Sequence, residues 1–425
     1  MVITETRKTN FRYAMLSLVF VNVMINYLDR SNLAVANSAI SADLGLSPVQ
    51  MGYILSAFGW TYALLQIPGG LLADKIGPRV LYGACLITWS IATMALASAR
   101  GFAALFGFRL AIGAFEAPSY PINNRVVTSW FPDNERASAI AIYVSGQFIG
   151  LAFFSPVLVL IQQAYGWQGM FLITGAVGAV WGLVWYIFYR DPLDHPKANK
   201  AELDYIENGG GVLKGKVASA TSQQWADAGK IFSSTTLWGV YIAQFCMNAI
   251  LYFFLTWFPT YLVKYRGLDF VKSGFLGAIP FLAACAGLLL SGFISDSLAR
   301  RGTSVATARK MPIIIGLLIS VSIIGPNYTS ETFWVIFFLS LAFFGAGMAL
   351  ISWVFVSILS PKNLLGLTGG VFNFMGNVAS IVVPIVIGYI AQGGNFEPAL
   401  VFIATLGFIG ALSYIFLVRK VERIQ

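Results

Sequence analysis

The chain has 425 residues, of which 57% are hydrophobic and 11% are charged, and its mean hydropathy is +0.74. Soluble domains carry about 25% charged residues, so this composition excludes an ordinary soluble protein and indicates a polytopic membrane protein. The net charge of +9 does not indicate nucleic-acid binding, because the lysines and arginines are scattered among the predicted loops.

Apolar runs long enough to cross a bilayer recur along the whole chain. A crossing helix needs about 20 residues, and lipid allows only helices or closed barrels to span. These runs are too long for barrel strands. We therefore expect an all-α membrane protein with twelve transmembrane helices, at residues 12–34, 50–73, 79–98, 101–125, 137–162, 167–189, 236–263, 272–297, 309–326, 332–358, 363–392 and 397–418.

A polar segment at residues 190–235 separates the first six predicted helices from the last six. It holds a charged stretch at residues 200–207 that ends before three glycines, which predicts a short surface helix there. We expect three parts: an N-terminal half at residues 1–189, a cytoplasmic linker at 190–235 and a C-terminal half at 236–425.

The two halves share a weak internal repeat at the ends of their second helices. Gly70 lies four residues before Asp74, and Gly292 lies four residues before Asp296, with basic residues following in both cases. Two parallel six-helix halves with a substrate site between them match a known transporter architecture. We interpret the polar residues of these two loops as gating contacts: Asp74, Arg79, Asp296 and Arg300.

The distribution of basic residues predicts the orientation of the chain, because cytoplasmic loops carry an excess of lysine and arginine. With both termini in the cytoplasm, most of the loop cations lie on the cytoplasmic side. The opposite side then holds only Arg100, Lys264, Arg266 and Lys272.

Four ionisable side chains lie inside the apolar runs: Asp29 and Arg30 in the first, Arg109 and Glu116 in the fourth. A charge at the centre of a membrane helix costs at least about 2.5–3.5 kcal/mol, so such residues usually face a cavity or each other. When all four side chains are ionised, the charges of the two acids and the two arginines nearly cancel. Protonation of one acid leaves a positive charge that an anion can neutralise, which predicts a proton-coupled anion carrier.

Arg109 and Glu116 are seven residues apart, about two helical turns, and therefore share one face. One interpretation is an ion pair that only holds the fourth helix to the first, although a buried pair is a weak source of stability. The other is that Glu116 gains and loses a proton, because burial disfavours its charged form and nearby arginines favour it.

Asp29 and Arg30 are adjacent, so their side chains diverge by about 100° on a helix. We assign Arg30 to a substrate carboxylate, whose two oxygens match the planar guanidinium. Asp29 is either a second proton site or a partner of Arg109. The alternative is that the two residues only cap a broken first helix.

The chain resembles the anion:cation symporter branch of the major facilitator superfamily over nearly its whole length. The resemblance rests on residues 26–32 (NYLDRSN), 58–70 (FGWTYALLQIPGG), 115–118 (FEAP) and the loop at 70–79. Within that branch it is similar to bacterial sugar-acid/proton symporters. This implies a multi-pass protein of the bacterial inner membrane that imports a hexonate, most of all D-galactonate, with protons; a hexuronate or glucarate is the alternative cargo.

The resemblance also implies roles for individual residues. Glu116, Asp29 and Arg109 take part in proton coupling, and Arg30 binds the anion. The implied sugar contacts are Tyr27, Tyr62, Gln147, Ser352, Trp353 and Asn373. Leu350 departs from the pattern, because relatives have a small polar residue there, and this leaves the choice of sugar acid open.

Other classes of function fit less well. A proton/drug antiporter of the same fold prefers neutral or cationic cargo, and a channel needs a continuous polar pore. An enzyme needs a nucleophile with a base, or a metal set, and the one histidine, His195, lies in the linker, where we expect it to be solvated. We therefore predict no catalytic residues, no cofactor and no metal, and a monomer whose partners are a small organic anion, protons and the bilayer.

Overall fold

The computed structural model describes residues 8–213, 229–361, 364–419 and 421–423, and every regular element within them is a helix. Residues 214–228 of the predicted linker lie outside the described residues. The first half contains six helices: α1 (Phe11–Leu44), α2 (Pro48–Ile76), α3 (Pro78–Leu96), α4 (Phe102–Glu116), α5 (Ser119–Trp130) and α6 (Asp133–Phe188).

Local sequence explains where several of these helices begin and end. Ser47 and Gln50 form a reciprocal capping box at the start of α2, with Pro48 in its first turn. Within α6, Gly166 adopts φ 70° and ψ 176°, a conformation that suits glycine and divides α6 into two legs. The predicted span at 101–125 is interrupted before Pro118, which separates α4 from α5.

The linker packs against the start of the first half. It contains η1 (Pro192–Asp194) and α7 (Lys200–Asn208), which confirms the short helix expected near residues 200–207. The Glu202 side chain on α7 is fully buried and accepts hydrogen bonds from the backbone N–H groups of Phe11 and Arg12, at 3.1 and 3.2 Å. It also forms an ion pair of 3.2 Å with Arg12. Glu202 thus caps α1 from a distant part of the chain.

The second half repeats the helical plan with more interruptions. Its long helices are α10 (Thr235–Thr256), α12 (Phe270–Arg300), α13 (Val305–Ser320), α14 (Thr332–Ala349), α16 (Leu365–Gln392) and α17 (Glu397–Phe416). Shorter elements join them: α9 (Gly229–Ser233), α11 (Phe258–Thr260), η2 (Tyr261–Tyr265), η3 (Val321–Tyr328), η4 (Leu350–Ser352) and α15 (Trp353–Leu359).

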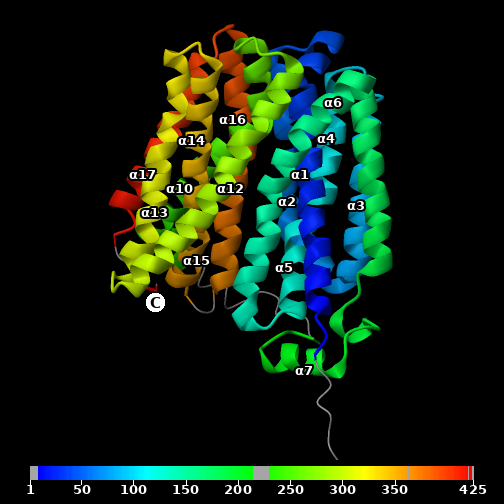
Figure 1. Cartoon of the computed structure of the whole chain (residues 1–425), viewed down its shortest axis with the longest axis vertical. Coiled ribbons are helices and arrows are strands. Elements are labelled where there is room, and N and C mark those ends of the chain that lie inside the picture. Colours follow the sequence, from blue (N-terminus) through cyan, green and yellow to red (C-terminus); the bar gives the residue numbers. More distant parts are fainter. Residues whose placement is uncertain (1–7, 214–228, 362–363, 420, 424–425) are drawn as a thin grey trace, which may run out of the picture.

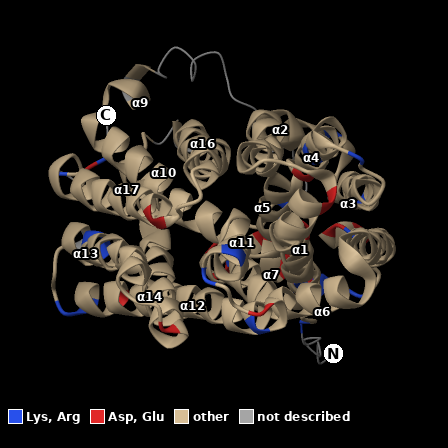
Figure 2. Cartoon of the chain, turned by 90° about the horizontal axis from the view of Figure 1, so that it is seen from above, with Lys and Arg blue, Asp and Glu red and all other residues tan. Residues whose placement is uncertain are grey.

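The helices form two groups that lie side by side, α1–α6 in one and α10–α17 in the other (Figures 1 and 2). Helix α7 lies at one end of the molecule, which we call the α7 end, and α1 begins and α17 ends toward that same end (Figure 1). Within the described residues nine helices are long and apolar enough to cross a membrane. One of the nine is the whole of α6, which covers the two predicted spans at 137–162 and 167–189. The predicted spans at 50–73 and 101–125 are not among the nine. Twelve crossings therefore stay a prediction.

The two halves meet between α2 and α16 and between α6 and α12. We call the row of contacts between α2 and α16 the seam. At the end away from α7, Gly52 packs against Pro384 and Gly388, and further along Gly59 packs against Ser380. Small residues allow this close approach of two helices. Near the α7 end, α5 and α15 make their principal contacts within their own halves. The close glycine contacts of the seam thus lie toward the end away from α7.

Candidate substrate and proton site

The centre of the first half contains a buried ion pair between Arg30 on α1 and Glu116 on α4. The Arg30 Nε donates to Glu116 Oε1 at 2.7 Å, and Arg30 Nη2 lies 2.6 Å from the same oxygen. The Asn26 amide donates to that oxygen too, at 3.2 Å. Glu116 is fully buried and Arg30 is 6% exposed. Two hydrogen bonds, from Arg30 Nε and from Asn26, thus converge on one carboxylate oxygen, as expected for a charge held away from water.

Three aromatic rings surround the guanidinium of Arg30. Its central carbon lies 4.8 Å from the ring centroid of Tyr27, 4.7 Å from that of Phe58 and 4.6 Å from that of Tyr62. A cation over an aromatic face is stabilised electrostatically, and more strongly when it is desolvated. These three rings form an aromatic cage. Two of them, Tyr27 and Tyr62, were predicted as sugar contacts, and they lie against Arg30, the predicted anion-binding residue. Phe58 was missed, although its position one turn before Tyr62 is a usable signal.

Asp29 points away from this cage. Its Oδ2 accepts a hydrogen bond of 2.9 Å from the indole N–H of Trp89 on α3. Arg109 donates to the backbone carbonyl of Asp29 at 3.4 Å and lies 5.3 Å from the Phe58 ring. Among the described residues no ion pair joins Arg109 to either acid. The ion pair that links α1 to α4 is formed by Arg30, not by Arg109 as one sequence interpretation had it.

Several buried polar atoms around the ion pair have no hydrogen-bond partner within the described chain. They are Asn26 Oδ1, Asp29 Oδ1, Arg30 Nη2, Arg109 Nε and Glu116 Oε2. Buried polar atoms in native proteins are nearly always satisfied, so unpaired ones indicate a place where another species binds. The free Oε2 of Glu116 is well suited to take up a proton, because Oε1 is already occupied.

The second half contributes polar groups without charge. Ser352 donates to Gln244 at 3.4 Å, and the Asn373 amide donates to Gln66 of the first half at 2.7 Å. Trp353 is 46% exposed, and its ring packs edge-on against Phe372. Gln147 is buried on α6. Gln66 was not predicted, because one glutamine in an apolar run carries no distinguishing signal.

The predicted gating residues lie near the ends of their helices with partners that the sequence did not identify. Asp74 pairs with Arg125 at 3.1 Å, and Asp296 pairs with Arg309 at 2.7 Å. Arg79 instead donates to the backbone carbonyl of Tyr186 at 2.9 Å, and Arg300 is exposed.

His195 differs from expectation. It is partly buried, with its ring 4.9 Å from Phe11 and 5.5 Å from Trp130. Burial, together with the neighbouring Arg190, lowers the pKa of this imidazole. The histidine was predicted to be solvated because the linker is polar, but the rings of Phe11 and Trp130 cover part of it.

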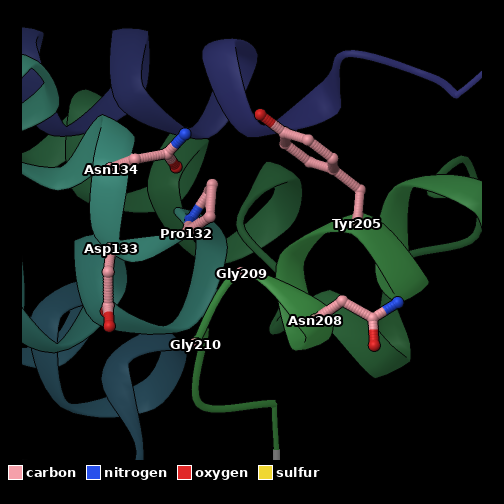
Figure 3. A pocket seen from close by; sticks show the side chains of 7 residues that line it. All are labelled: Pro132, Asp133, Asn134, Tyr205, Asn208, Gly209 and Gly210. Carbon is pink, nitrogen blue, oxygen red and sulfur yellow. The ribbon is translucent and has the colours of Figure 1, made fainter.

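A surface hollow of about 650 Å³ lies between the start of α6 and α7, and none of the embedded charges lines it. In Figure 3, Tyr205 and Asn208 on α7 lie across from Asp133 and Asn134 on α6. The hollow is thus separate from the site around Arg30.

The pattern of the Major Facilitator Superfamily matches residues 19–384. The chain belongs to the major facilitator superfamily. Its membership confirms the family resemblance and the helical fold, and it makes the protein a membrane transporter rather than an enzyme. Among the described residues no group of three or more His, Cys, Asp or Glu side chains could hold a metal ion.

Similar transporters of the superfamily cover almost the whole chain. A D-galactonate transporter of Escherichia coli O6:H1 is 48% identical over 97% of this chain and 97% of its own length. A probable galactarate/D-glucarate transporter GudP of Bacillus subtilis is 41% identical over 98% of this chain and 94% of its own. A hexuronate transporter of Bacillus subtilis is 32% identical over 95% and 94%.

Solved structures share the fold of this superfamily member at low sequence identity. A bacterial homolog of the human lysosomal transporter Spinster, in an inward-facing and occupied conformation, aligns with a TM-score of 0.72 and 19% identity over 96% of this chain and 95% of that one. A mutant of the nucleoside transporter NupG aligns with a TM-score of 0.70 and 15% identity over 95% of this chain and 100% of that one.

Proposed function

We propose that the protein is a monomeric symporter that imports a sugar-acid anion with protons by alternating access. The proposed cargo is a hexonate, most of all D-galactonate. The observation that carries the proposal is the Arg30–Glu116 pair. In it, the arginine proposed to bind the anion is paired with an acid that can take up a proton. The D-galactonate transporter that is 48% identical supports the choice of cargo.

Protonation of Glu116 couples the two substrates in this scheme. A neutral carboxyl group holds a guanidinium far less strongly than a carboxylate does, so the proton frees the two nitrogens of Arg30 that now contact Oε1. The carboxylate of the cargo then takes their place, within the rings of Tyr27 and Tyr62. On the low-proton side Glu116 ionises, reclaims Arg30 and displaces the anion.

The remaining predicted residues divide the other tasks. Asp29 is proposed as a second proton site and Arg109 as a fixed cation that favours the ionised acids. Hydroxyl groups of the cargo are proposed to contact Gln147 in the first half and Ser352, Trp353 and Asn373 in the second. In the gating loops, Asp74, Arg79, Asp296 and Arg300 act together with Arg125 and Arg309, the partners of the two aspartates.

The proposed location is the bacterial inner membrane, with both termini and α7 in the cytoplasm. One proton per monoanion makes transport electroneutral. A second proton moves one net charge inward, which adds about 2.3 kcal/mol of driving force per 100 mV. The stoichiometry therefore depends on whether Asp29 titrates.

A dicarboxylate such as galactarate or D-glucarate is the second candidate cargo, because a probable galactarate/D-glucarate transporter is 41% identical to this chain. A second carboxylate needs a second cation. Arg109 is 3% exposed and is not paired with an acid among the described residues, so it is the candidate for that role.

The test is uptake by proteoliposomes under an imposed pH gradient, with D-galactonate, D-glucarate and D-glucuronate as separate substrates. We expect D-galactonate to accumulate above its outside concentration, and the accumulation to collapse with a protonophore. Uphill uptake of D-glucarate alone would select the second candidate. Uptake that only equilibrates the substrate, and ignores the gradient, would overturn proton coupling.

A further inference from the structure

The seam between the two halves includes a hydrogen bond between two side-chain amides. Gly52, Gly59 and Gln66 follow one another at intervals of seven residues, so they lie on the same face of α2. Gly52 and Gly59 contact α16 through close packing. The third position of this face contacts α16 through the 2.7 Å hydrogen bond between Gln66 Oε1 and the Asn373 amide.

Gly370 lies about one turn from Asn373 on α16, toward the α7 end. A Cβ atom added at Gly370 would have no neighbour within 4 Å among the described residues, apart from the backbone next to it. The Gln66–Asn373 pair therefore borders open space on the side of α16 that leads toward the α7 end. On α2 it is followed at once by Pro68, Gly69 and Gly70, which remove a backbone donor and loosen the helix.

The same pair joins the charged part of the site to the uncharged part. Gln66 lies one turn after Tyr62, whose ring lies 4.6 Å from the Arg30 guanidinium. On the other side, the Asn377 amide donates to Asn373 Oδ1 at 3.4 Å, and Tyr252 donates to Asn377 at 3.5 Å. An anion held at Arg30 thus has the amide pair as its next polar neighbour along α2.

We propose that Gln66 is a specificity residue that recognises hydroxyl groups of the cargo, exchanging its Asn373 partner for them. This inference rests on the proposed function, because it takes the anion to be bound at Arg30. An amide and a hydroxyl group both donate and accept. A polyhydroxy acid can therefore insert between the two partly buried amides and satisfy both, whereas a cargo without the hydroxyl has nothing to exchange for the bond between them.

The exchange also gives the cargo a direct effect on the interface. The hydrogen bond between Gln66 and Asn373, which joins the two halves, is broken by the same hydroxyl that is recognised. Only a cargo that reaches from Arg30 to the seam removes this contact between the halves. A short carboxylate that fills Arg30 alone leaves the contact in place.

Binding of D-galactonate and of its monodeoxy analogues to the purified protein, measured by titration calorimetry, tests this inference. Gln66→Met keeps the length of the side chain and removes its polar atoms. We expect it to weaken D-galactonate binding about tenfold. At least one monodeoxy analogue should bind equally well to the variant and to the wild type. That analogue lacks the hydroxyl group that the Gln66 amide would contact, so removal of the amide costs it nothing. Gln392→Met, at the exposed far end of α16, is the matched control and should change nothing.

The outcomes separate the two proposals. If Gln66→Met weakens every analogue by the same factor, or weakens none, Gln66 is not a hydroxyl ligand and this inference is overturned while the proposed function stands. If the wild type itself does not bind D-galactonate, the proposed cargo fails and this inference falls with it. If Gln66→Met does not purify as a monodisperse protein, Gln66→Asn replaces it, because its shorter amide does not reach the same hydroxyl.

Discussion

Arg30 places its Nε and Nη2 on the same oxygen of Glu116, at 2.7 and 2.6 Å, and leaves Oε2 of that carboxylate without a partner within the described chain. The arginine is thereby occupied by an acid that one proton can neutralise. This single contact links the charge of Glu116 to the availability of Arg30, and the first two predictions below depend on it.

Glu116→Gln should abolish uphill, gradient-driven uptake while retaining substrate binding and exchange. The amide cannot gain or lose a proton and holds Arg30 only weakly, so binding should also lose most of its pH dependence. Proteoliposome accumulation and counterflow measure the two activities. Asp133→Asn, at a largely exposed acid on α6, should leave both unchanged. Wild-type accumulation by the Glu116 variant would remove this residue from the proton path.

Arg30→Lys should weaken anion binding about 10–100-fold even though it preserves the charge. Lysine offers a point charge in place of the planar fork, and a hydrogen bond to a charged group contributes about 1.5–3 kcal/mol. The dissociation constant at low pH, where Glu116 is protonated, is the quantity to measure. Arg190→Lys, whose side chain contacts backbone carbonyls at the end of α6, serves as the control. An unchanged constant for the Arg30 variant would place the anion elsewhere.

Leu350→Ser should change the relative preference among sugar acids by about 2–10-fold, the range of one neutral hydrogen bond. Leu350 is partly buried in η4, two residues before Ser352, which bonds Gln244. Competition of unlabelled hexonates, hexuronates and glucarate against a labelled substrate reports the preference. Leu288→Ser on α12 provides the comparison. If both variants show the wild-type order of preference, Leu350 only fills space.

Glu202→Ala should strongly lower the thermal stability of the protein in detergent. Removal of one partner from a buried ion pair costs about 3–5 kcal/mol, and Glu202 also accepts two backbone N–H groups at the start of α1. Glu207→Ala, on an exposed position of the same helix, should change stability little. Equal melting temperatures for the two variants would show that α7 does not stabilise the first half.

Protonation of His195 should loosen α7. Because burial and Arg190 lower its pKa, the folded state favours the neutral imidazole, and the stability this provides is present near neutral pH. It is lost as the pH falls below about 6.5, the usual pKa of histidine. Hydrogen exchange of α7 at pH 7.5 and 5.5 measures the effect, which His195→Phe should reduce. An equal increase of exchange in both proteins would assign it to other groups.

The fold could be predicted from hydropathy, because a run of about 20 apolar residues has one stable form in lipid. The four embedded charges could be predicted for a similar reason, since each of Asp29, Arg30, Arg109 and Glu116 stands out in an apolar run. The partners of these four residues could not be predicted from the sequence. Whether Arg30 or Arg109 meets Glu116 depends on the rotation of α1 and α4 about their axes, and both helices carry apolar residues on every side.

The uncharged polar contacts were harder to predict for another reason. Gln66, Asn373 and Asn377 are neutral, so their placement in an apolar run has a smaller energetic cost and a weaker signal. The partners of Asp74 and Asp296 were missed because Arg125 and Arg309 lie 51 and 13 residues further along the chain. Sequence spacing alone does not bring them together.

The buried charged side chains of the described residues all belong to the first 202 positions: Arg12, Asp29, Arg30, Arg109, Glu116 and Glu202. Substitutions in α10–α17 can therefore alter the shape of the cargo that is accepted without touching the groups that respond to protons. Such a division lets related transporters diverge in cargo by mutation of one half while they inherit the same energy source in the other. Hybrid proteins that join this first half to the second half of a relative should keep the coupling of one parent and take the substrate range of the other.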